Sequence, residues 1–324
     1  MAKTNINLEY WMSNLPVHLR TWPLIRLAIP GSHDSMTASI TKSSKIAPDA
    51  ECLLQKLRFL GPLLRLIMSR WSKTQDLTIG DQLRCGIRYY DLRVATRRNK
   101  TYPYFVHGLY ADEITTMVTS VREFIDSHPH EVVILDFQHF YAFAEEDHHN
   151  LITLLLTVFK SKLLPYTNDM NHITLEFMTE SNKYQIILIY RANYSRLSQQ
   201  YLWPSFTFPT PWPQTISQTD LFDKLNRGIA TRLQSFAYVS QCVLTPTNGF
   251  VAKKLCSTLK KTCVVPIHGA RIEWIQQQRI GEGGVNIVIG DFVNLNDFEF
   301  PAEVVQLNLQ VFPTNASILT PVDN

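Results

Sequence analysis

Two histidines at the ends of apolar, strand-like runs are the residues of this chain best placed to do chemistry. His33 follows the run LIRLAIPGS, and His107 follows the run YFV. A third run between them contains Asp91 and Arg93, which are two residues apart and should therefore face the same side of a strand. Two imidazoles, a carboxylate and a guanidinium are the groups that metal-free cleavage of a phosphodiester requires.

In such a reaction one imidazole removes a proton from the attacking hydroxyl, and the other protonates the leaving oxygen. The guanidinium stabilises the charge that develops on the phosphoryl oxygens. A single histidine at a strand end is more often a hydrogen-bonded structural residue. The combination of His33 and His107 with Asp34 and Arg93 favours the catalytic interpretation.

The surrounding elements alternate between apolar, β-branched runs and helical patterns. Strands are predicted at 24–29, 87–94, 104–107, 132–137, 184–190, 239–244 and 285–292. Helices are predicted at 112–127, 146–164, 220–235 and 267–278, with Asp112 and Glu113 in a first turn. Strands buried on both faces that alternate with helices indicate a parallel sheet, and seven or eight such units indicate a closed (β/α) barrel.

Chemistry in such barrels takes place at the carboxyl ends of the strands, which form the mouth. The polar residues at predicted strand ends are His33, Asp91, Arg93, His107, Gln138, Arg191 and Asp291.

Two segments depart from the alternation. Residues 42–76, here called the insert, contain an apolar stretch at 52–71 whose only charges are basic, and Gly61-Pro62 should divide it into two short amphipathic pieces. This pattern suits a helix at a membrane interface, and equally a helix that covers one end of the barrel. The proline-rich segment 203–213 should form a rim loop over the mouth or a packed connector.

Composition sets the broad class. The chain has 324 residues, 45% of them hydrophobic, and a net charge of +3, which is too small to indicate a nucleic-acid partner. Five scattered cysteines without metal-ligand spacing, and a polar start, indicate reduced thiols in a cytoplasmic protein. No run is long enough to span a membrane, so any membrane contact should be peripheral. The pattern gives no indication of oligomeric state.

At this point the motifs resemble a known family. The sequences PGSHDS (30–35), GIRYYDLR (86–93) and FVHG (105–108) are similar to the X domain of phosphatidylinositol-specific phospholipase C, and most closely to proteins that consist of this domain alone. The resemblance covers most of residues 20–295. It implies a single-domain, distorted (β/α)8 TIM-type barrel. It places an N-terminal extension at 1–20, the X-box region with the insert at 21–195, and the rest of the barrel with a tail at 196–324.

The residues around His33 also indicate which branch of that family the chain resembles. Asp34 follows the histidine, and Arg93 stands where the calcium-dependent branch has a metal-binding acid. The resemblance therefore implies the calcium-independent arrangement, with no metal and no cofactor. Gln138 departs from the pattern, because one branch has a glutamate there and the other a lysine.

The resemblance also implies roles. His33 would be the general base on the inositol 2-hydroxyl, oriented by Asp291, and His107 would be the general acid on the glycerol oxygen, kept protonated by Asp34. Arg93 would stabilise the pentacovalent phosphorus. The remaining implied positions would bind the sugar: Asp91, Arg191 and Gln138.

These roles predict a phosphoric diester hydrolase that cleaves phosphatidylinositol-class lipids to diacylglycerol and an inositol phosphate. Three alternatives remain open. The barrel could bind phosphoinositides with little turnover, it could resemble a glycerophosphodiester phosphodiesterase, or Arg191 and Asp291 could form a structural ion pair at the rim.

Overall fold

The computed structural model describes residues 6–50, 61–192 and 199–310. Seven parallel strands lie in the order β7-β6-β5-β2-β1-β9-β8, and a hairpin, β3 and β4, extends from β2 in the antiparallel sense. The strands are β1 (Ile29–Ser32), β2 (Tyr89–Ala95), β3 (Tyr104–His107), β4 (Leu109–Glu113), β5 (Val133–Tyr141), β6 (Ile186–Tyr190), β7 (Leu202–Trp203), β8 (Val239–Gln241) and β9 (Ile287–Gly290).

The circle of parallel strands has a gap between β7 and β8, where no ladder joins the described strands. The segment after β7 spans this gap with single hydrogen bonds. The carbonyl of Thr207 accepts from the amide of Ala237, and the carbonyl of Pro209 accepts from the amide of Val239. The predicted fold, a distorted TIM-type barrel in one domain, is confirmed.

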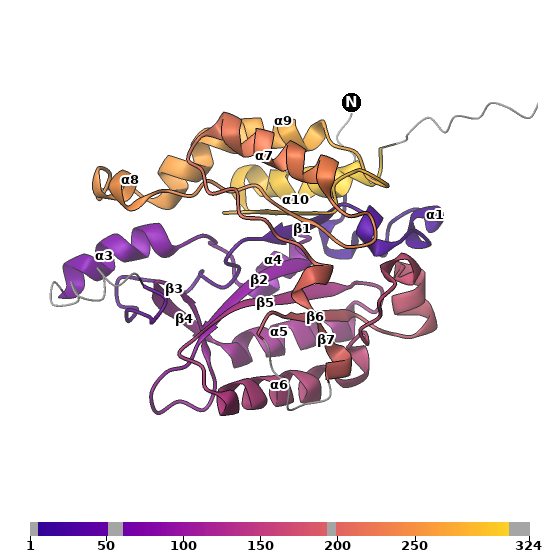
Figure 1. Ribbon diagram of the computed structural model, residues 1–324, viewed down its shortest axis with the longest axis horizontal. Coiled ribbons are helices and arrows are strands. Elements are labelled where there is room, and N and C mark those ends of the chain that lie inside the picture. The colour runs from indigo at the N-terminus through magenta and orange to yellow at the C-terminus, as the bar shows by residue number, and fades with distance from the viewer. Residues whose placement is uncertain (1–5, 51–60, 193–198, 311–324) are drawn as a thin grey trace, which may run out of the picture.

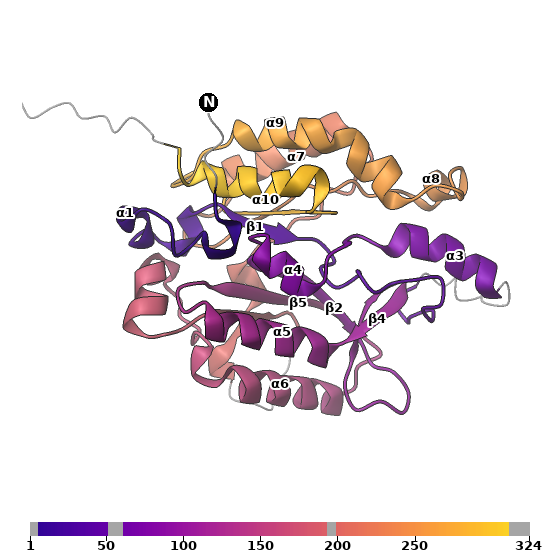
Figure 2. The ribbon, with the colours of Figure 1, turned by 180° about the vertical axis from the view of Figure 1, so that it is seen from behind.

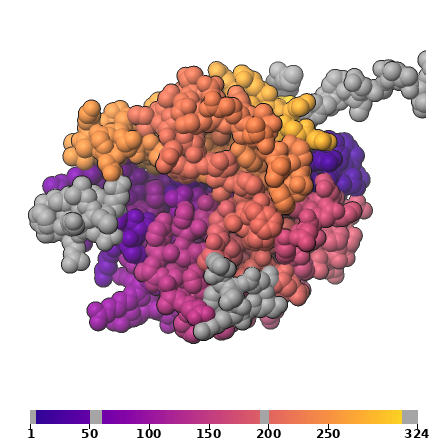
Figure 3. Space-filling view, viewed as in Figure 1, coloured from indigo at the N-terminus to yellow at the C-terminus, as the bar shows by residue number. Residues whose placement is uncertain are grey.

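Helices surround the sheet on both sides. Figures 1 and 2 show α5 and α6 along one side of the barrel and α7, α9 and α10 along the other, with α3 and α8 together at one end. The α-helices are α1 (Val17–Arg20), α3 (Gly61–Ser72), α4 (Ile79–Arg84), α5 (Ile114–Ser127), α6 (Glu145–Phe159), α7 (Gln218–Thr231), α8 (Asn248–Ala252), α9 (His268–Gln276) and α10 (Leu295–Leu307). In the space-filling view, the orange-red part of the chain after β6 covers the middle of the side that is turned to the viewer (Figure 3).

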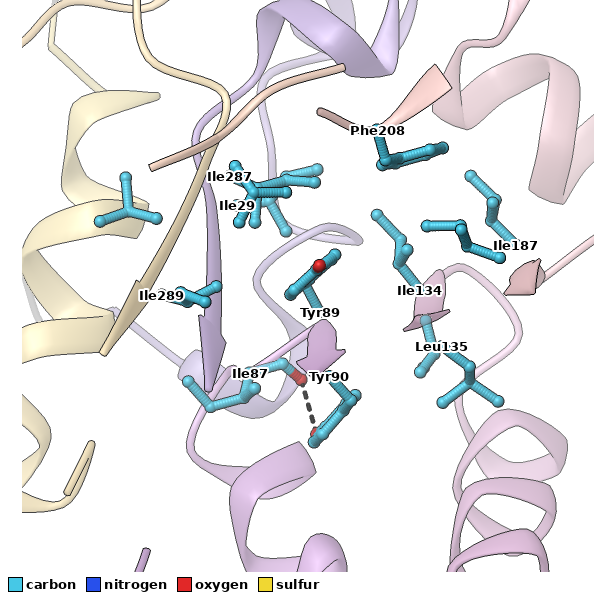
Figure 4. Packing of buried hydrophobic residues seen from close by; sticks show 14 of the residues in the cluster. Ile29, Ile87, Tyr89, Tyr90, Ile134, Leu135, Ile187, Phe208, Ile287 and Ile289 are labelled. Carbon is cyan, nitrogen blue, oxygen red and sulfur yellow. Dashed lines mark hydrogen bonds between the residues drawn. The ribbon is translucent and has the colours of Figure 1, made fainter. Parts of the chain in front are cut away.

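The interior of the barrel is filled by side chains from the strands. Figure 4 shows Ile29, Tyr89, Ile134 and Ile287 converging, with Phe208 beside them. All of these side chains are essentially buried. A barrel packed in this way leaves its chemistry to the mouth, where the polar residues at the strand ends meet solvent.

Several predicted boundaries were wrong. Residues 24–26 form a 3₁₀ turn rather than the start of a strand. The amide of Leu24 donates to the carbonyl of Ile173, and the side-chain amide of Asn286 donates to the carbonyls of Leu24 and Leu27, so these groups are not available to a β-ladder. Asp112 and Glu113 belong to β4 rather than to a helix, since the hairpin pairs Glu113 with Tyr104. The sequence pattern did not predict β4, β7, α1, α8 or α10.

The described part of the insert packs one face of a helix against the barrel. Helix α3 buries Leu64 and Met68 against Leu109 of the hairpin, while Leu63 is 60% exposed. One face of α3 therefore packs on the barrel and another is open to solvent. The first amphipathic piece, with Lys56 and Arg58, lies outside the described residues.

A buried ion pair fixes the N-terminal segment beneath the barrel. The guanidinium of Arg88 donates to the carboxylate of Glu131 at 2.8 and 3.0 Å, and neither side chain is exposed. The same carboxylate accepts from the amide and the hydroxyl of Ser13 at 2.8 and 2.6 Å. Nearby, the indole of Trp11 donates to the carbonyl of Gly86.

Glu131→Ala should lower the free energy of unfolding by about 3–5 kcal/mol, because it leaves the Arg88 guanidinium buried without an opposite charge. Asp126→Ala is the matched control, since it breaks an exposed pair with Arg122 and should cost less than about 1 kcal/mol. Urea denaturation monitored by tryptophan fluorescence measures both. Similar losses for the two variants would contradict the structural role of the buried pair.

Candidate active site

The carboxyl ends of β1 and β2 bring the first three predicted residues together. The two strands are parallel neighbours, and His33 directly follows β1. The prediction that Asp91 and Arg93 share a face is confirmed, because Arg93 Nη2 donates to Asp91 Oδ2 at 3.1 Å. The register between β2 and β5 shifts at this level, so that Arg93 pairs with His139 and Gln138 is the extra residue of the bulge.

His33 lies between a carboxylate and a guanidinium. Its Nδ1 is 2.8 Å from Asp291 Oδ1, and its Nε2 is 3.1 Å from Arg93 Nη2. Because Arg93 can only donate, Nε2 accepts and the neutral ring carries its proton on Nδ1, toward Asp291. Burial lowers the pKa of His33, but the carboxylates of Asp34 and Asp291 outweigh that effect and raise the pKa above its ordinary value.

His107 reaches the site by a different route from the one predicted. Strand β3 is antiparallel to β2, so the hairpin extends past the barrel edge and returns His107 to the level of Arg93. His107 Nε2 is 3.2 Å from Asp34 Oδ2, and its Nδ1 donates to the carbonyl of Ser72 at 2.7 Å. Each ring nitrogen thus faces an oxygen that can accept a hydrogen bond.

Asp34 lies between the charged groups of the site. Its Oδ1 is 2.6 Å from Arg93 Nε, and its Oδ2 lies 3.2 Å from His107 Nε2 and 3.4 Å from His33 Nε2. Burial raises the pKa of this carboxyl, but Arg93 and the two histidines outweigh burial, and the pKa is lowered. The backbone adopts a positive φ of 39° to present the side chain in this way.

His33, Asp34 and Asp91 have the donor types and the spacing of a metal site, with ligand atoms within 4.8 Å of one another. Arg93, however, contacts all three residues through Nε and Nη2. Its guanidinium therefore provides the positive charge that a cation would bring, and it would repel a cation placed beside it. The residues present fit an arginine-centred site.

Comparison with known proteins identifies the family and the fold. No family model matches the chain. PI-PLC X domain-containing protein 2 of Mus musculus is 37% identical over 301 residues, which cover 92% of this chain and 87% of the relative. PI-PLC X domain-containing protein 3 of Homo sapiens is 34% identical over 311 residues, which cover 95% of each chain.

This chain belongs to the family of PI-PLC X domain-containing proteins.

Solved structures show the same fold at lower identity. Phosphatidylinositol-specific phospholipase C from Listeria monocytogenes superposes with a TM-score of 0.62 at 17% identity, covering 94% of this chain and all of the other. The enzyme from Staphylococcus aureus, in a structure concerned with modulation of its membrane binding, gives 0.62 at 15% identity, covering 93% and 98%.

In this X domain-containing protein, Arg191 and Gln138 form a second group beside the histidines. Arg191 donates to both oxygens of Asp136 at 2.8 and 2.7 Å, and Asp136 also accepts from the hydroxyl of Tyr89 at 2.6 Å. Gln138 donates to the same hydroxyl at 3.3 Å. The alternative ion pair between Arg191 and Asp291 is therefore wrong, since each of these residues has another partner.

Sequence reasoning missed three residues of the X-domain site. Asp136 lies within an apolar strand, where its pairing directly opposite Asp91 on the neighbouring strand places it at the same level. Trp212 comes from the proline-rich segment and places its ring 5.1 Å from the ring of His33 and 5.8 Å from the Arg93 guanidinium. That segment supplies both a short strand and a rim loop.

Asp49 of the insert accepts from the amide of Gly108.

No helix within 6–50, 61–192 and 199–310 has both the length and the apolar character needed to cross a membrane. The cysteines of these ranges are free thiols at Cys85, Cys242, Cys256 and Cys263, whereas Cys52 lies outside them.

Asp291→Asn should lower the pKa of His33, because it removes a carboxylate that raises it. A raised pKa in the folded state stabilises the protein below about pH 6.5, and this contribution is lost as the pH rises through the pKa of folded His33. The variant should therefore show a weaker fall of folding stability above pH 6.5. NMR titration of the His33 ring, together with denaturation at several pH values, measures both effects. An unchanged ring titration in Asp291→Asn would contradict the assignment.

Proposed function

We propose that this protein is a calcium-independent phosphodiesterase that cleaves phosphatidylinositol-class lipids to diacylglycerol and an inositol phosphate. One observation carries the proposal. The rings of His33 and His107 lie 6.4 Å apart, Asp34 lies within 3.4 Å of both rings, and Arg93 contacts His33 and Asp34. Binding alone does not require two imidazoles that share one carboxylate beside a guanidinium.

In the proposed first step His33 acts as the general base. Its Nε2 takes the proton of the inositol 2-hydroxyl, whose oxygen attacks phosphorus and forms a cyclic phosphodiester. Asp291, 2.8 Å from Nδ1, orients the ring and stabilises the imidazolium that results.

His107 then protonates the glycerol oxygen as the bond to phosphorus breaks. Its ring is 29% exposed, so a substrate at the mouth can reach it, and Asp34 stabilises its charged form. Arg93 donates to the phosphoryl oxygens as their charge grows, which is where a fixed guanidinium contributes most.

The group around Arg191 is suited to the sugar. Asp91 and Gln138 offer acceptors and donors for ring hydroxyls, and Arg191 is held in place by its two hydrogen bonds to Asp136. Trp212, at 37% exposure, offers an apolar face beside His33.

We also propose that the protein is cytoplasmic and makes peripheral contact with membranes through α3 and residues 248–265. Trp71 packs edge-on against Phe250 at 6.3 Å, and Lys260 pairs with Asp76 at 2.6 Å, so the two segments form one surface. Figures 1 and 2 show both at the same end of the molecule. The surface exposes Leu63 and Leu255 among lysines and arginines, which suits an anionic interface.

His33→Ala and His107→Ala should each lower turnover of phosphatidylinositol at least ~10²-fold, because each removes a proton-transfer group. Wild-type turnover should be unchanged when EGTA is present. Diacylglycerol release from mixed micelles measures both results. Arg93→Lys should also lose most of the rate, since an ammonium cannot make the two-pronged contact of a guanidinium.

His130→Ala is the matched control, because this exposed histidine precedes β5 at the opposite end of the barrel and should leave the rate unchanged. Lipid binding without turnover in the wild type would favour a binding module. A requirement for a divalent cation would favour the metal-dependent glycerophosphodiester phosphodiesterase alternative.

Leu63→Ala combined with Leu255→Ala should weaken binding to phosphatidylserine vesicles about tenfold or more, because two apolar side chains no longer enter the interface. Both side chains are exposed, so the melting temperature should not change. Val17→Ala in α1 is the control, since Val17 is 76% exposed at the other end of the molecule. Unchanged vesicle sedimentation of the double variant would contradict the proposed docking surface.

A further inference from the structure

The insert encloses the turn that carries His107. The amide of Ala47 donates to the carbonyl of Gly108 at 3.0 Å, and the amide of Tyr110 donates to the carbonyl of Lys45 at 2.9 Å. At the other end of the insert, the carbonyl of Ser72 accepts from His107 Nδ1 at 2.7 Å. The insert thus holds His107 at its Nδ1 and also holds the backbone of Gly108 and Tyr110, which follow it in the hairpin.

Asp49 provides the shortest of these contacts. Its Oδ2 accepts from the amide of Gly108 at 2.6 Å, directly beside the histidine. Gly108 has a positive φ of 69°, and a Cβ at this position would lie 3.0 Å from the hydroxyl of Ser72. The turn therefore requires glycine, and a glycine has little stiffness of its own, so its neighbours must fix its position.

The surroundings of the Asp49 carboxyl disfavour its charged form. Its Oδ1 is buried and has no hydrogen-bond partner among the described residues. Burial raises the pKa of Asp49, an effect that the Gly108 amide and the charge of His107 only partly offset. A buried, incompletely paired carboxyl costs free energy, so its position suggests a role other than stability.

We propose that Asp49 is a positioning residue for the general acid: by fixing Gly108 it aims His107 at the leaving oxygen. This inference rests on the proposed function, and it assigns to the insert a part in protonating the leaving group. Asp49 itself does not touch the substrate.

The role can be separated from simple stabilisation by varying the leaving group. A short-chain phosphatidylinositol kept monomeric in solution has an alcohol as leaving group, and the alcohol needs a proton from His107. Nitrophenyl inositol phosphate releases a nitrophenolate, which is stable without a proton. Both substrates are soluble, so membrane docking does not affect the comparison.

Asp49→Ala should lower kcat on the short-chain lipid ~10- to 100-fold, because a small displacement of the acid is costly. It should lower kcat on the nitrophenyl substrate no more than about twofold, the same pattern of selectivity that His107→Ala gives. Asp49→Asn should restore most of the lipid rate, because its amide oxygen still accepts from Gly108. Should Asp49→Ala not fold, Asp49→Ser takes its place, since its hydroxyl is too short to reach the amide.

Ile40→Ala is the matched control. Ile40 is buried against Leu64, Met68 and Leu109 beneath the same segment, so its truncation lowers the melting temperature without touching Gly108. It should change both rates by the same factor. Equal losses on the two substrates in Asp49→Ala, no loss on either, or no rescue by Asp49→Asn would each overturn the inference. A wild type that turns over neither substrate would instead refute the proposed function, and the inference with it.

Discussion

The compensation of charge around Asp34 is the constraint on which the rest of the site depends. The buried carboxylate of Asp34 lies within 3.4 Å of Arg93 and of both histidines. Each partner makes the burial of the others tolerable, because an unpaired charge at this depth would cost several kcal/mol. The same compensation fixes the positive charge of Arg93 where the proposed function places the phosphoryl group.

The barrel supplies the rigidity that this cluster needs. Gln75 donates to the carbonyls of His33 and Gly290, and so holds the ends of β1 and β9 at a fixed separation. Asp291 follows β9 and meets His33 from that neighbouring strand. Below these strand ends the interior is filled with buried side chains (Figure 4), and such close packing resists displacement of the strands. His33, Asp34, Arg93 and Asp291 therefore lie directly above the packed core, whereas His107 lies on the hairpin.

His107 is the exception, and it links the site to the more peripheral parts of the fold. Its hairpin lies outside the parallel circle, and its contacts come from the insert. Helix α3 of that insert also exposes the apolar side chain of Leu63. In this family member, the element that holds one of the two proposed catalytic histidines is thus continuous with the surface proposed to meet the lipid. The bacterial structures share the barrel fold at only 15–17% identity.

The sequence by itself determined the barrel, the family and most of the central cluster. Strand alternation placed Asp91 beside Arg93, and parallel strand ends placed His33 near them, because these relations depend on local geometry that the pattern records. Only the tertiary structure decided the partners that come from elsewhere. Arg191 binds Asp136 across neighbouring strands, and Trp212 and Asp49 arrive on irregular segments whose course no periodicity specifies. The sequence singled out His107, but the route of this residue through an antiparallel hairpin depends on strand pairing, which local sequence does not fix.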